Sequence, residues 1–120
     1  MTKRKLPRFA ACMAMMRKHD PAIQEDGFHT LLPHAVHFIE ELLNELALEK
    51  HSHGLRCWLL ELIGKARDPR ALGVLVNYLR AGDESLRYWA VEGLRRLDTH
   101  EARKALYEAG EPRGRAEGDR

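Results

Sequence analysis

Residues 55–61 read LRCWLLE, and residues 86–92 read LRYWAVE. Four of the seven positions are identical, and one of these identities pairs the only tryptophans in the 120-residue chain, Trp58 and Trp89. The two segments lie 31 residues apart, and self-similarity at a period of roughly 20 to 50 residues is typical of proteins built from stacked repeats. The sequence therefore predicts a short repeat protein in which two adjacent repeats each carry this motif.

The residues around these segments predict helices and no strands. Asp20-Pro21 and Asp68-Pro69 each place an N-capping side chain before a proline, which is favoured at the first helical position. Apolar residues recur with the 3.6-residue period of a helix, and no run of strand length alternates between apolar and polar residues. We expect an all-α fold of about seven helices, over residues 6–18, 21–32, 34–49, 53–66, 69–81, 84–97 and 99–109.

Charge is distributed unevenly along the chain, although the net charge is only +2. Residues 1–19 hold six basic side chains and no acidic ones, whereas residues 20–50 hold seven acidic side chains and one basic. Residues 110–120 are rich in Gly, Pro and charge, a composition typical of disorder. We therefore expect a basic N-terminal segment or helix over 1–19, a repeat domain over 20–109 and a disordered tail over 110–120.

Composition also bears on where the protein resides. No stretch approaches the 18 or so uncharged apolar residues of a membrane span. Two cysteines, Cys12 and Cys57, are too few for a disulfide framework, and a reducing compartment is the simpler setting for them. We expect a cytoplasmic protein that does not enter a membrane.

A second pattern covers residues 67–97, where DPRAL at 68–72 is followed by regularly spaced leucines and by GL at 93–94. This segment resembles a HEAT-like repeat of the short bacterial type that also occurs in phycobilin-lyase proteins. Residues 53–71 resemble the second helix of the preceding repeat and its link to the next. The resemblance covers about residues 50–108 and implies a short α-solenoid of right-handed stacked helical pairs. Such repeats occur in scaffolds, adaptors, some lyases and some DNA glycosylases, so the resemblance selects no single function.

The resemblance also implies where a partner would bind, because the second helix of each HEAT-like repeat lines the concave face. The residues that point away from the core stripe on the helices expected over 53–66 and 84–97 are the predicted contact residues, namely Cys57, Trp58, Glu61, Lys65, Tyr88, Trp89, Glu92 and Arg96. The family usually carries a small residue at the two tryptophan positions, and stacked repeats would put the indoles side by side. The indoles then form either a binding hot spot or core packing between adjacent helices.

Four further residues are expected to have structural roles. Arg56 and Arg87 fall at the family's common arginine position. The resemblance implies that such arginines tie neighbouring repeats to loop aspartates, for which Asp68 and Asp83 are the candidates.

Signals for catalysis, metals and cofactors are weak. The chain has no GxSxG, GxxxxGK[ST], GxGxxG, HExxH or CxxC motif. Arg56 beside Cys57 could lower the pKa of that thiol, but no motif places a histidine to act as its base. Of the seven histidines, only His34 and His37 share a predicted helix face, which falls short of the three or four ligands of a zinc site. We expect no enzyme activity, no metal and no cofactor.

Nucleic acid is a disfavoured partner. A phosphate-binding surface requires clustered lysine and arginine. On the predicted concave face, Lys65 and Arg96 are offset by Glu61 and Glu92.

These observations favour a non-enzymatic protein-interaction module, either a small adaptor or scaffold. One version is an immunity-type or antitoxin-type inhibitor of a basic effector, steered by the acidic residues expected on the third helix, Glu40, Glu41, Glu45 and Glu49. Self-association through the ends of the solenoid is another version. The alternatives are a nucleic-acid-binding protein related to alkylpurine DNA glycosylases and a small lyase-type protein. Both of these predict a pocket between Trp58 and Trp89.

Overall fold

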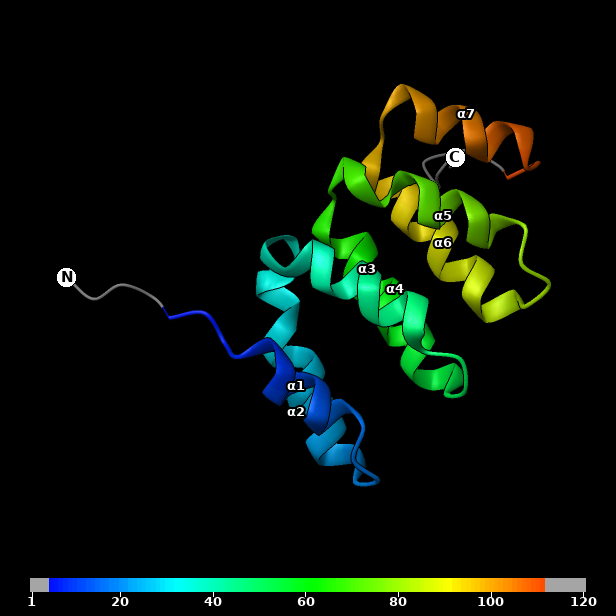
Figure 1. Ribbon diagram of the computed structural model, residues 1–120. Helices are drawn as coiled ribbons and strands as arrows, with labels where there is room; N and C mark the ends of the chain where they lie inside the picture. The colour runs from blue at the N-terminus through cyan, green and yellow to red at the C-terminus, as the bar shows by residue number, and fades with distance from the viewer. Residues whose placement is uncertain (1–4, 112–120) are drawn as a thin grey trace, which may run out of the picture.

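The computed structural model describes residues 5–111 and is helical throughout, with no strand in that range (Figure 1). Its elements in chain order are α1 (Phe9–Met16), α2 (Pro21–Leu31), the 3-10 segment η1 (Leu32–Phe38), α3 (Ile39–Leu48), α4 (His53–Ala66), the 3-10 segment η2 (Pro69–Ala71), α5 (Leu72–Leu79), α6 (Glu84–Leu97) and α7 (His100–Glu108). The helices stack in sequence order from α1 and α2 at one end of the molecule to α7 at the other (Figure 1). The predicted all-α solenoid is confirmed.

The boundaries of α4 and α6 repeat at the same 31-residue spacing as the sequence motif. Ser52 and Asp83 are the N-caps of α4 and α6, and each accepts a hydrogen bond from a backbone N–H three residues on. Arg67 and Asp98 end the same two helices in the left-handed conformation, with φ of 52° and 51°. Left-handed backbone is uncommon outside glycine, so its recurrence at equivalent positions shows that the two repeats share one turn geometry.

The core of the repeat domain lies between the second helices of the two repeats. Leu59, Leu62 and Ile63 of α4 and Leu94 of α6 are fully buried. Glycine allows the backbones of these helices to meet, because a Cβ added to Gly64 would lie only 2.9 Å from the Cα of Gly93. Gly93 lies on α6 directly opposite, so α4 and α6 are fixed at one crossing point.

Proline changes two of the predicted helices. The predicted helix over 34–49 is instead a 3-10 segment containing Pro33, followed by α3 from Ile39. Pro33 has no backbone N–H to donate to the hydrogen-bond ladder of α2, which ends at Leu31. Similarly, residues 69–71 after Asp68 form a 3-10 turn before α5 begins. The first helix is also shorter than the predicted 6–18, since α1 covers only Phe9–Met16.

The predictions for the two ends of the chain fall partly outside the described range. Residues 1–4 of the basic segment and residues 112–120 of the predicted tail lie beyond it. Across residues 5–111, no helix combines the length and the apolar character needed to cross a membrane.

Candidate functional site

A cavity of about 380 Å³ lies where the first helices meet the two repeats. Its lining comes from α1, α2, α4 and α6 and from the cap before α4, and consists of Met16, Gln24, Ser52, Gly54, Leu55, Cys57, Trp58, Glu61 and Trp89. Both tryptophans therefore border one cavity. Met16 and Gln24 come from the N-terminal helices, which the resemblance did not cover.

Each tryptophan packs partly against protein and partly borders the cavity. Trp58 is half-buried and stacks on the buried ring of Phe28, with centroids 5.0 Å apart and the planes 20° from parallel. Trp89 is also half-buried, and the exposed ring of Tyr88 meets it edge to face at 4.9 Å. Each indole is therefore partly packed against the protein and partly exposed at the cavity, so the geometry is compatible with both core packing and a binding surface.

Among the described residues, Glu61 is the only charged one in the cavity lining. Its burial raises the pKa of the carboxyl group, and the positive charges of Lys65, Arg96 and His29 act against that rise. Neither Lys65 nor Arg96 belongs to the lining, and within residues 5–111 neither makes an ion pair with Glu61. The carboxylate thus loses part of its hydration without gaining a direct partner, which is costly for a charged group.

The predicted contact residues separate into three groups. Cys57, Trp58, Glu61 and Trp89 line the cavity, and Lys65, Arg96 and Tyr88 surround it. Glu92 is not part of the lining and pairs with Arg95 at 3.2 Å.

His53 is a neighbour of Cys57 that the sequence analysis missed. Its ring nitrogens lie 3.9 and 4.0 Å from Cys57 Sγ, at the outer limit of a sulfur hydrogen bond, and its Nε2 lies 2.9 Å from Asp83 Oδ2. Burial raises the pKa of the Cys57 thiol, the charge of Asp83 raises it further, and Arg56 opposes the rise. A raised pKa keeps the thiol protonated, so this arrangement is not an activated nucleophile. The i, i+4 spacing of His53 and Cys57 was the available sequence signal.

The arginines predicted to hold loop aspartates have other partners. Arg56 donates to the Tyr78 hydroxyl at 3.1 Å and lies over the same ring, 5.7 Å from its centroid. Arg87 donates to the carbonyl of Leu79 and pairs with Glu111. The predicted arginine–aspartate ties are therefore wrong for both arginines.

The two aspartates have nearer partners. Asp68 caps the turn after α4 and pairs with Arg70 at 2.9 Å. Asp83 caps α6 and pairs with His53. A capping backbone N–H and an adjacent basic side chain thus contact each carboxylate, so neither depends on a distant arginine for a partner.

The acidic third helix is partly neutralised by the protein's own arginines. Arg17 contacts Glu45 at 3.0 Å and Glu49 at 3.3 Å. Arg70 contacts Glu40 at 2.9 Å. Much of the charge that was expected to steer a basic partner is thus engaged within the chain.

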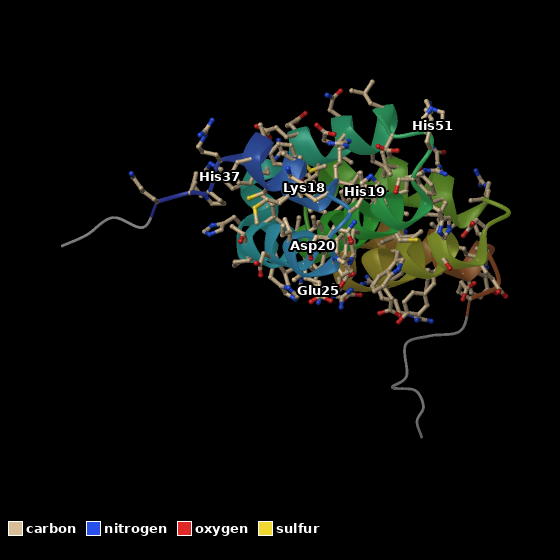
Figure 2. The ribbon with its side chains drawn as sticks, turned by 90° about the horizontal axis from the view of Figure 1, so that it is seen from below. Lys18, His19, Asp20, Glu25, His37 and His51 are labelled. Carbon is tan, nitrogen blue, oxygen red and sulfur yellow. The ribbon has the colours of Figure 1, made fainter. Side chains whose placement is uncertain are left out.

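The histidines do not converge. His37 and His51 lie at opposite sides of the molecule, with His19 between them on the turn before α2 (Figure 2). In the part of the chain that the structure describes, no group of three or more His, Cys, Asp or Glu side chains is arranged to hold a metal ion.

Comparison with known proteins identifies the fold family. The pattern of the family described as HEAT repeats matches residues 39–115, which is more than half of the chain. No curated protein and no solved structure shows significant similarity. The repeat of the capped helices at a 31-residue offset and the family match agree, and the chain belongs to the HEAT repeat family.

Proposed function

We propose that the chain is a non-enzymatic protein-interaction module that binds its partner at the surface around Trp58 and Trp89. HEAT repeats commonly serve as protein-interaction modules, and the family is generally non-catalytic. The observation that carries the proposal is the cavity bordered by two half-buried indoles, flanked by the exposed ring of Tyr88. Half-buried aromatic side chains around a desolvated pocket are the usual anchors of protein interfaces. We also propose that the protein is cytoplasmic, and the free thiols of Cys12 and Cys57 are compatible with a reducing compartment.

The proposal is tested by capture of partners from the lysate of the cell that makes the protein. Three baits are compared: wild type, Trp89→Ala, and Tyr107→Ala as the control. Tyr107 is 83% exposed on α7 and does not border the cavity, so its loss removes an exposed aromatic ring elsewhere. We expect one partner that wild type and Tyr107→Ala retain and that Trp89→Ala loses at least tenfold.

Far-UV circular dichroism establishes that the Trp89→Ala bait is folded. If it is not, Glu61→Gln replaces it, because that change alters the cavity while keeping the size of the side chain. A partner set that is the same for the cavity variant and wild type overturns the proposal.

A second candidate function is binding of a small molecule in the same cavity, as the lyase-type alternative requires. The volume of about 380 Å³ favours it, because small-molecule sites occupy roughly 300 to 1,000 Å³. The capture experiment separates the two, since a small-molecule site predicts no protein whose retention depends on Trp89. Nucleic-acid binding lacks comparable support, because the lining holds one carboxylate and no basic side chain.

A further inference from the structure

The cavity has the chemical character of a cation site. Its lining includes the indoles of Trp58 and Trp89, and the only charged group that residues 5–111 contribute to it is the carboxylate of Glu61. A cation held within about 6 Å of an indole face is attracted by the negative face of the ring system. Of all the natural side chains, arginine combines this stacking with planar, bidentate pairing to a carboxylate.

Gln24 adds an acceptor to the same lining. Its amide nitrogen donates to the carbonyl of Lys18 at the turn between α1 and α2. The amide oxygen of Gln24 accepts no hydrogen bond within residues 5–111, so it is available to an incoming donor. It adds an acceptor to the carboxylate of Glu61, and among the described residues no lining side chain is a lysine or an arginine.

The energetics of Glu61 favour a charged occupant. Burial raises the pKa of this carboxyl group, and no ion pair to it is formed within residues 5–111. A guanidinium that enters the cavity would restore to the carboxylate the interactions that it loses with water. Lys65 and Arg96 stand outside the lining, so they leave the space itself open, although their charges compete with a cation for Glu61.

We propose that the cavity between Trp58 and Trp89 binds an arginine side chain of the partner protein, with its guanidinium against the indoles and paired to Glu61. The volume of about 380 Å³ can accommodate one long side chain. This inference rests on the proposed function, because it names the group that the partner inserts. Under this proposal the carboxylate in the cavity attracts the basic partner. The carboxylates of α3, which the sequence pattern predicted in this role, are largely paired with arginines of the same chain.

The test uses a small probe, N-acetyl-arginine methylamide, and its neutral counterpart, the citrulline derivative. The readout is the pair of indole N–H signals in ¹H–¹⁵N NMR spectra of uniformly labelled protein, which are assigned with Trp58→Phe and Trp89→Phe. Only two tryptophans exist in the chain, so each signal reports one wall of the cavity. We expect the arginine probe to shift both signals in a saturable manner, and the citrulline probe to bind at least fivefold more weakly.

Two charge variants test whether the probe pairs with Glu61, because they are expected to change its affinity in opposite directions. Glu61→Gln is expected to weaken the arginine probe at least fivefold. Lys65→Gln removes a competing positive charge from an exposed position and is expected to tighten binding about twofold. Equal binding of the citrulline probe, no effect of Glu61→Gln, or a lysine probe that binds as tightly as arginine would overturn the proposal.

The outcome also separates this inference from the proposed function. If a captured partner depends on Trp89 but the arginine probe leaves the indole signals unmoved, the arginine assignment fails and the interaction module stands. If no partner depends on Trp89 although the probe binds as expected, the proposed function fails and the cavity remains a cation site.

Discussion

Two Gly→Ala substitutions are expected to change stability in opposite directions, because one glycine lies at a helix crossing and the other in open space. A Cβ on Gly64 would lie 2.9 Å from Gly93 Cα, well inside van der Waals contact, and the obstacle is backbone that moves only if α4 and α6 separate. Overpacking of this kind costs about 1–3 kcal/mol. Alanine regains about 1 kcal/mol of helix propensity, so a net destabilisation of up to about 2 kcal/mol remains.

Gly73, near the start of α5, is the matched control. A Cβ there meets no atom within 4 Å, so Gly73→Ala has the propensity gain without the clash. We expect it to stabilise the protein by about 0.5–1 kcal/mol. Urea denaturation followed by circular dichroism measures both variants against wild type. A Gly64→Ala protein as stable as the Gly73→Ala protein would refute the backbone contact between α4 and α6.

Three further predictions concern ionisable groups. Burial raises the pKa of Glu61, so the ionised form opposes folding at neutral pH. Glu61→Gln should therefore raise the melting temperature at pH 7 and not at pH 3.5, and an unchanged or lower value at pH 7 would count against a desolvated carboxylate. The hydrogen bond from the Leu86 backbone, and after it the one from His53, lowers the pKa of Asp83. The ionised carboxylate therefore stabilises the folded protein above the ordinary aspartate pKa, and this stabilisation is lost as the pH falls through the lowered pKa. Asp83→Asn should accordingly flatten the decline in melting temperature between about pH 5 and pH 2, and a decline as steep as in wild type would contradict this. The raised pKa of Cys57 predicts that iodoacetamide alkylates this thiol more slowly at pH 8 than a free thiol, and faster in Asp83→Asn than in the protein with Asp83. Mass spectrometry of proteins that carry Cys12→Ser measures both rates. A Cys57 rate above that of a free thiol would contradict the raised pKa.

The helix boundaries could be predicted well because each depends on local chemistry. The two second helices, over 53–66 and 84–97, match α4 and α6 in both bounds. Their caps and apolar periods lie within a few residues of one another, so tertiary packing had little to override. The prediction was less accurate near Pro33, because a proline is compatible with the start of an α-helix and also with a 3-10 segment. The structure has a 3-10 segment in place of the first turns of the predicted helix.

Partners of charged residues could not be predicted in the same way. Arg56 bonds to the hydroxyl of Tyr78, while Asp83 already accepts the capping hydrogen bond of α6. Which of these partners lies within reach of Arg56 depends on how the helices pack, and the sequence does not show this. The salt bridges from Arg17 to α3 join residues 28 and 32 positions apart. No sequence periodicity links such positions, so the sequence carries no sign that the carboxylates of the acidic helix pair with Arg17.

The position of the cavity follows from the contrast between glycine and tryptophan on the same two helices. Trp58 lies six residues before Gly64, and Trp89 lies four residues before Gly93, which corresponds to about 9 Å and 6 Å along the helix axes. Two helices that cross at an angle diverge away from the crossing point. The glycines hold α4 and α6 together at one level, and Trp58 and Trp89 lie about one to two turns earlier on their helices, where both border the cavity. The residues that fix the crossing are therefore distinct from those of the proposed binding surface. Gly64→Ala, which acts on the crossing, should shift both indole N–H signals, whereas Glu61→Gln should alter the response to arginine and leave the crossing intact.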